Sequence, residues 1–305
     1  MIRLTLVCAA IAMPCAVQRA STQLETPPAQ NVAIGIVRAD GMLFPLAQLH
    51  DDVWTPLSRH NSEGTTSHLT NAGRRLAGEV WKAFPINGAA SFPLTVRGVS
   101  TVDSHCTRTE AIRTDAPKRP FPQRTFPAPK TAIAVSGSAT ALSIESLRPP
   151  YDGAARRITR VVVSVTQAFE RERTDAAANS PLAKYTAAER SRVSVQITAL
   201  VRNATVVGNA YYFEARKRYT AGLELRVSGW ITDSAGEIQL RNVRGALDED
   251  GRNVETSQVL GAVTLRDRTV WVLEAHGYES EAYDLIEFVA SEPFRRAIRI
   301  AGGGC

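Results

Sequence analysis

The stretch VAIGIVRADGMLFPLAQLHDDVWTPL, residues 32–57, decides the fold class of this chain. Its first β-branched run ends at Asp40-Gly41, a dipeptide that supplies the positive φ angles of a tight hairpin turn. The second apolar run ends at an aspartate-rich turn, residues 50–52, and a third run follows. Because Pro45 cannot donate to a β-ladder, the second strand is expected near a sheet edge. The stretch therefore predicts a three-stranded antiparallel meander.

Short apolar runs separated by turn residues continue to the C-terminus. Residues 58–76 are polar and rich in Gly, Ser and Thr, and are expected to form a loop. Turn signals recur roughly every 8–12 residues, a spacing typical of antiparallel sheets. Further strands are expected at residues 78–84, 92–102, 109–114 and 131–147, and then at 193–197, 210–219, 223–227, 238–246, 259–265, 269–275, 283–289 and 297–300.

One segment has the apolar spacing of a helix instead of a strand. Ile158, Val162 and Phe169 fall on one helical face, with charged residues on the others. Asp152 precedes the segment and can cap its first turn. We therefore predict one amphipathic helix at about residues 153–176, covering a face of a sheet.

These elements place the chain in the mainly β class, with an α+β second half of antiparallel sheets or meanders and one amphipathic helix. We divide it into a β-meander module at 32–115, a linker at 116–130 that holds five prolines, and an antiparallel sheet module at 131–305. The alternative is an irregular β-propeller-like fold, because residues 34–57 and 262–288 each have the pattern of a three-stranded blade with a Trp.

Residues 1–20 have the pattern of a secretory signal peptide. Arg3 precedes a short apolar run, residues 4–13, and small residues follow. The run is too short to span a membrane. We favour cleavage after Ala20, with residues 21–31 as a disordered lead-in; an N-terminal helix retained in the fold is the alternative. A signal peptide predicts a secreted or periplasmic protein.

Charge and cysteine content narrow the functional classes. The chain has a net charge of +6, but it lacks the basic stripe with interleaved aromatics of a nucleic-acid binder. We therefore expect no nucleic-acid partner. No stretch beyond the leader approaches the length of a membrane span, so we expect no transmembrane anchor either. Beyond the leader only Cys106 and Cys305 remain, which are too few for a structural zinc site. An oxidising compartment permits a disulfide between them, and a free Cys305 is the alternative. No metal and no cofactor are expected.

The densest polar segment, residues 271–284, offers an enzymatic alternative. Glu274 and His276 share one face of the predicted strand and could do acid–base work if the fold brought His50 to them. The chain lacks the motifs of serine hydrolases, zinc proteases and phosphate-binding loops. A polar turn between two core strands is the simpler interpretation. We therefore do not expect an enzyme, and a secreted hydrolase built from distant His and carboxylate residues stays the alternative.

Aromatic residues on strands supply the candidate binding site. Trp54, Tyr211 and Phe213 could stack on a sugar ring or grip a peptide if they are exposed, and burial of all three would contradict this role. The function predicted from the sequence is an exported, non-enzymatic, β-rich binding or structural protein of the cell envelope or exterior. Its predicted partner is carbohydrate or another envelope protein.

Three segments carry a resemblance to other proteins. They are IGIVRADGMLFPLAQLHDDVW at 34–54, NAYYFEARKRY at 209–219 and RTVWVLEAHGYESEAYDLIEF at 268–288. They resemble segments of uncharacterised exported bacterial proteins. The resemblance implies export, and it transfers neither an activity nor a catalytic residue to this chain.

Overall fold

A computed structural model describes residues 31–61, 65–104, 107–122, 125–175, 180–249, 254–265, 267–277, 279–292 and 294–304. Strands dominate these residues, almost all strand pairs are antiparallel, and one long amphipathic helix is present. The predicted class, mainly β with antiparallel sheets and one amphipathic helix, is therefore confirmed.

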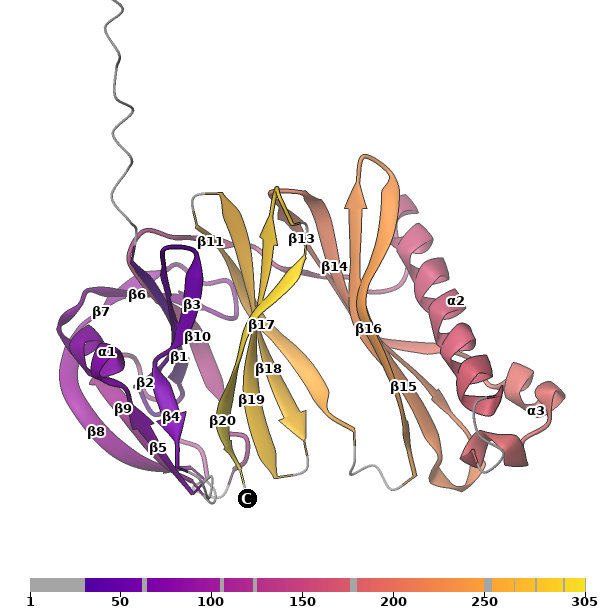
Figure 1. Ribbon diagram of the computed structural model, residues 1–305, viewed down its shortest axis with the longest axis horizontal. Helices are drawn as coiled ribbons and strands as arrows, with labels where there is room; N and C mark the ends of the chain where they lie inside the picture. Colours follow the sequence, from indigo (N-terminus) through magenta and orange to yellow (C-terminus); the bar gives the residue numbers. More distant parts are fainter. Residues whose placement is uncertain are drawn as a thin grey trace, which may run out of the picture.

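Three sheets stack in a row, and a helix covers the outer face of the last one (Figure 1). Sheet A contains β1 Val32–Arg38, β2 Met42–His50, β3 Val53–Pro56, β4 Ser58–His60, β5 Thr66–Leu69, β6 Trp81–Pro85, β7 Phe92–Leu94, β8 Val96–Ser104, β9 Thr107–Thr114 and β10 Lys130–Ser136. Sheet B contains, in spatial order, β11 Thr140–Leu142, β17 Thr256–Leu265, β18 Arg268–Gly277, β19 Ser280–Val289 and β20 Arg295–Gly304. Sheet C contains, in spatial order, β12 Glu145–Ser146, β13 Gln196–Thr205, β14 Gly208–Arg218, β15 Glu224–Ser234 and β16 Glu237–Asp248.

The decisive stretch forms β1, β2 and β3 as an antiparallel meander, as predicted. Asp51 and Asp52 take positive φ angles, 45° and 62°, in the second turn. The expected edge position of β2 is wrong, because β2 pairs with β1 on one side and with β3 and β9 on the other. Pro45 is tolerated because it stands opposite Gly35 where the β1–β2 ladder shifts register, a bulge that needs one donor fewer.

Two segments that the sequence assigned to a loop and to a linker contribute to sheet A. The predicted loop at 58–76 contains β4, β5 and the helix α1, Asn71–Arg75. At the end of the predicted linker, 116–130, strand β10 begins and pairs with both β1 and β6. Sheet A therefore takes in residues up to Ser136, beyond the boundary expected between the two modules.

Sheet B lies between sheets A and C, so both of its faces are buried. Successive side chains of its strands point alternately toward the two neighbouring sheets. Val270 and Val272 of β18 belong to a core shared with Ile34 of sheet A. Trp271 of the same strand belongs to a core shared with Trp230 of sheet C. The sheets are thus stacked face to face and not arranged around a central axis, so the propeller alternative is wrong.

The long helix lies where the sequence placed it. Helix α2 spans Gly153–Asp175, and Asp152 Oδ1 accepts a hydrogen bond from the Ala155 N–H at 2.6 Å. Its apolar face packs on sheet C, where Ile158 shares a core with Phe213. The other helical segments are η1 Leu76–Gly78, η2 Pro181–Lys184, α3 Ala187–Arg192 and η3 Thr220–Gly222.

Candidate functional site

A cleft of about 450 Å³ opens between sheets B and C. Strands β13 to β16 of sheet C line one side, and strands β17 to β20 of sheet B line the other, together with residues 254–255. We call this space the B–C cleft. Its volume lies within the range of small-molecule sites, which are concave and combine apolar surface with a few polar groups.

The apolar part of the B–C cleft continues the core between the two sheets. Tyr212 and Trp230 of sheet C face Leu273 and Ile286 of sheet B. Trp230 packs edge-on against the buried Trp271, with ring centroids 5.0 Å apart. The aromatic core therefore gives the cleft one firmly packed, apolar border.

The carboxylates that sheet C contributes to the cleft already have partners. Glu214 accepts hydrogen bonds from the Tyr212 hydroxyl at 2.7 Å and from the Ser257 N–H at 2.9 Å. Glu224 pairs with Arg218 at 2.7 Å and with Arg226 at 2.6 Å. Glu224 is thus paired with two cations, whereas the two donors to Glu214 are neutral groups.

Asp284 is the carboxylate that sheet B contributes. It lies 3.2 Å from Arg299 and 3.4 Å from Arg296. Burial raises the pKa of Asp284 above its ordinary value, although Arg299 and, across the cleft, Arg244 act in the opposite direction. Glu255 also pairs with Arg299, at 3.1 Å. Both acids on this side are therefore held by arginines.

Two arginines of the cleft have no carboxylate partner among the described residues. Arg216 donates only to the side-chain oxygen of Gln196, at 3.2 Å. Arg244 is exposed and forms no ion pair within 4 Å in the described part of the chain. The B–C cleft thus combines an apolar border with two guanidinium groups that can still bind an anion.

The structure overturns the predicted aromatic site. Trp54 is 8% exposed, and Tyr211 and Phe213 are 0% exposed. Trp54 faces sheet B, whereas Tyr211 and Phe213 lie under α2 with Ile158. No ring face of the three is free to stack on a sugar, so the assignment of these residues to ligand binding is wrong.

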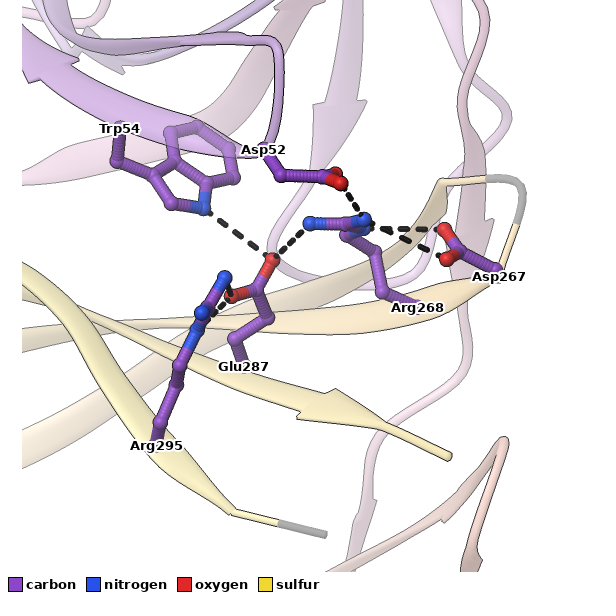
Figure 2. Close-up of polar contacts among 6 residues, drawn as sticks. All are labelled: Asp52, Trp54, Asp267, Arg268, Glu287 and Arg295. Atoms are coloured by element: carbon purple, nitrogen blue, oxygen red, sulfur yellow. Dashed lines mark hydrogen bonds and ion pairs between the residues drawn. The ribbon is translucent and has the colours of Figure 1, made fainter. Parts of the chain in front are cut away.

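Trp54 belongs instead to a buried ion-pair cluster that joins sheets A and B (Figure 2). Glu287, fully buried on β19, accepts hydrogen bonds from Trp54 Nε1 at 3.3 Å, Arg268 Nη1 at 2.8 Å and Arg295 Nε at 2.6 Å. Arg268 also pairs with Asp52 in the β2–β3 turn. All the acceptor contacts given for Glu287 are thus with residues of sheets A and B, and its side chain is fully buried.

Glu274, a member of the predicted catalytic set, lies in a second buried cluster on the same face of sheet B. Lys130 of β10 pairs with Glu274 and, at 3.1 Å, with Glu281. Burial raises the pKa of Glu274 to about 7, against the lowering effect of Lys130. Tyr283 donates to Glu281. The space beside this cluster measures about 30 Å³, enough for water but not for a substrate.

The three residues of the predicted catalytic set do not converge. His276 lies 3.6 Å from Glu274, and burial lowers the pKa of this His. His50 adjoins the turn whose Asp52 contacts Arg268, at the opposite end of β18. The eight residues from Arg268 to His276 span roughly 26 Å of extended strand. Since general acid–base partners need hydrogen-bond contact, a hydrolase site made from these three residues is wrong.

Several predictions concern residues that the structure does not describe. The signal peptide at 1–20 and the disulfide between Cys106 and Cys305 lie outside the described residues. No group of three or more His, Cys, Asp or Glu side chains in the described part of the chain could hold a metal ion. None of the described helices is both long and apolar enough to cross a membrane.

Sequence reasoning missed the B–C cleft, although one signal was available. Alternation along β14 separates Tyr212, Glu214 and Arg216 from Tyr211 and Phe213. The first set is polar at one end and aromatic at the other, as expected for a strand face that leaves a core and enters a cleft. Finding the opposite wall from the sequence would have required the stacking of sheet B on sheet C.

Comparisons with known proteins add no relative. A scan of protein-family models, a search of curated proteins and a search of solved structures each found no match. The resemblance to exported bacterial proteins stays a prediction, and the functional argument depends on the geometry of the cleft.

Proposed function

We propose that this chain is an exported, non-enzymatic binding protein that holds one small organic ligand in the B–C cleft. The observation that carries this proposal is the cleft itself, about 450 Å³ in volume, which joins an apolar border, closed by the buried rings of Tyr212 and Trp230, to a polar wall with four arginines. Small-ligand sites share this combination of concave apolar surface and a few directed polar groups.

The side chains around the cleft support binding over catalysis. Glu214, Glu224 and Asp284 already accept hydrogen bonds or ion pairs from protein donors. A general base needs a free lone pair that faces the substrate. The raised pKa of Asp284 follows from its burial between the sheets, and the two arginines beside it keep it in an ion-pair network.

Export is the second part of the proposal, and it is supported by the pattern of residues 1–20. When the full chain is expressed in a Gram-negative host, N-terminal sequencing of the periplasmic or secreted fraction should begin at Ser21. A full-length chain that starts at Met1 and stays in the cytosolic fraction would contradict export and leave the proposal on the cleft untouched.

A fluorescent organic anion, 8-anilinonaphthalene-1-sulfonate, tests the binding site. We expect saturable one-to-one binding by isothermal titration calorimetry, because multiple weak sites are the mark of non-specific adsorption or of a loosened fold. Ser228 lies on β15 between Glu214 and Arg244 on the cleft face. Ser228→Phe should therefore place a ring in the cleft and weaken binding about tenfold or more.

The matched control is Thr101→Phe, which adds the same ring to an exposed position of β8 in sheet A. It should leave the affinity unchanged, and thermal melts should show that both variants are folded. Absence of saturable binding, or equal binding by the wild type and Ser228→Phe, would refute the cleft as the site.

A further inference from the structure

We propose that the ligand of the B–C cleft is an organic anion, whose head group is held by Arg216 and Arg244 while its apolar body lies in the cleft. This inference rests on the function proposed above. It names the chemical class of the ligand, an apolar or aromatic body that carries a carboxylate, phosphate or sulfonate.

The arginines of the cleft differ in their pairing. Four arginines line it, and two of them are committed to acids, Arg226 to Glu224 at 2.6 Å and Arg296 to Asp284 at 3.4 Å. Arg216 and Arg244 have no such acid within 4 Å among the described residues. The lining also holds four acids, so its formal charge is balanced, but the two guanidinium groups without a paired acid are available to an anion.

Arginines also outnumber acids around Asp284, on the opposite wall of the cleft. Arg296 and Arg299 both pair with this carboxylate, and Arg244 approaches it closely enough across the cleft to lower its pKa. Glu255 is the second acid here, so three guanidinium groups meet two carboxylates. A negatively charged ligand group is the partner that this arrangement lacks.

The strand register brings the two uncommitted arginines to the same face. Arg216 stands opposite Arg226 on β15, and Ser228, two residues farther along, stands opposite Arg244 on β16. Arg216 and Arg244 thus flank β15, two strands or about 10 Å apart at their backbones. Both side chains are long enough to reach a head group between them, and guanidinium forks suit planar or tetrahedral oxyanions.

The geometry disfavours the other ligand classes. A cation would compete with arginines for Glu224 and Asp284, and with the Tyr212 hydroxyl and the Ser257 N–H for Glu214. A neutral apolar ligand would fill the cleft but would leave the Arg216 and Arg244 guanidinium groups without an anionic partner. An organic anion satisfies both parts of the cleft.

Two probes that share one aromatic body separate these classes. One is 8-anilinonaphthalene-1-sulfonate, and the other is N-phenyl-1-naphthylamine, which has the same rings without the sulfonate. We expect the anion to bind about tenfold more tightly than the neutral amine, since charge-assisted hydrogen bonds add to the ring contacts. The affinity of the anion should fall with added NaCl, and that of the amine should not.

Arginine variants assign the head group. Arg216→Gln and Arg244→Gln should each weaken binding of the sulfonate about three- to tenfold and leave binding of the amine unchanged. Arg244→Lys should restore most of the affinity, because it keeps the charge. The matched control is Arg160→Gln, at an exposed position of α2 on the far side of sheet C, which should change neither affinity.

The outcomes distinguish the two proposals. Equal affinity for both probes, or no effect of Arg216→Gln and Arg244→Gln while Ser228→Phe still blocks binding, would overturn the anionic head group and leave the cleft as a binding site. Failure of both probes to bind saturably would refute the proposed function itself.

Discussion

Sheet B packs against sheet A with one face and against sheet C with the other, and the two faces differ in their treatment of charge. On the face toward sheet A, Glu274 and Glu287 are buried with cations that neutralise them. On the face toward sheet C, Asp284 already has two arginines, and Arg244 has no acid within 4 Å in the described part of the chain. The first face is a sealed joint between sheets, whereas the second opens into a cleft.

A single strand contributes side chains to both the joint and the cleft. Leu273 and Glu274 are neighbours on β18, but the pleat sends Leu273 toward the cleft and Glu274 toward Lys130. Charges that are buried and paired hold the sheets together. Charges that are left over in a concave space are available to a ligand.

Removing Glu287 should have the largest effect. Glu287→Ala leaves Arg268 and Arg295 without the carboxylate that they share, and Arg268 is buried. Arg268 keeps Asp52 and Asp267 as partners, so the free energy of unfolding should fall by about 3–4 kcal/mol, toward the lower end for breaking a buried ion pair. Urea denaturation measures the change. The exposed Glu292→Ala is the control and should change stability by less than about 0.5 kcal/mol; equal effects would mean that the joint does not depend on charge.

The pH dependence of stability should be the next largest effect. The pKa of Glu274 in the folded protein, about 7, lies above its ordinary 4.5, so the folded state binds this proton more tightly than the unfolded state does. Stability should therefore fall as the pH rises from about 4.5 to 7, by about 3 kcal/mol from this group. Glu274→Gln stays neutral throughout and should lose less stability over the same window.

His276 acts in the opposite direction and makes the variant comparison necessary. Burial lowers its pKa in the folded protein, so this group adds stability as the pH rises through its ordinary value. Asp284 on the cleft face, whose pKa is also raised, should contribute with the same sign as Glu274. Urea titrations at about pH 5 and pH 8 give the change in the free energy of unfolding between the two pH values for the wild type, Glu274→Gln and Asp284→Asn. An equal change in the wild type and in Glu274→Gln would rule out Glu274 as the source.

A smaller effect is expected at Trp54. Trp54→Phe keeps most of the ring in the joint between sheets A and B but removes the N–H that donates to Glu287. The free energy of unfolding should fall by about 1–2 kcal/mol. In a double-mutant cycle with Glu287→Ala this cost should largely disappear, because the acceptor is already gone. A cost that persists would assign the effect to packing alone.

The smallest effect on stability is expected on the cleft face. Arg216→Gln and Arg244→Gln remove charges that have no acid partner in the described part of the chain. Each should change the free energy of unfolding by no more than about 0.5 kcal/mol, although both are expected to weaken ligand binding. A loss comparable to that of Glu287→Ala would show that these arginines serve the fold, and the difference between the two faces would vanish.

The local elements were predictable because they depend on short-range chemistry. The turns at Asp40-Gly41 and Asp51-Asp52 and the cap at Asp152 lie next to the elements that they limit. The apolar spacing that begins at Ile158 sufficed for the helix α2. Each of these signals is contained within a few residues of the chain.

The arrangement of the sheets was not predictable for the opposite reason. A strand such as β10 has the same sequence pattern whichever sheet it joins, and only its pairing with β1 and β6 places it in sheet A. Alternation showed that Tyr211 and Tyr212 point to different sides, but α2 covers one side and sheet B the other, so neither is open. Arg244 can lower the pKa of Asp284 across the cleft only because sheet B stacks on sheet C.

The position of β10 between β1 and β6 has a consequence for the order in which the chain folds. Ile34 pairs with Val135, so the centre of sheet A closes a loop of about one hundred residues. Until that strand has been synthesised, β1 can pair with β2 only, and its other edge stays open. Such long-range pairing is slow. A polypeptide delivered from its N-terminus therefore completes its first sheet only after nearly half of its length has emerged.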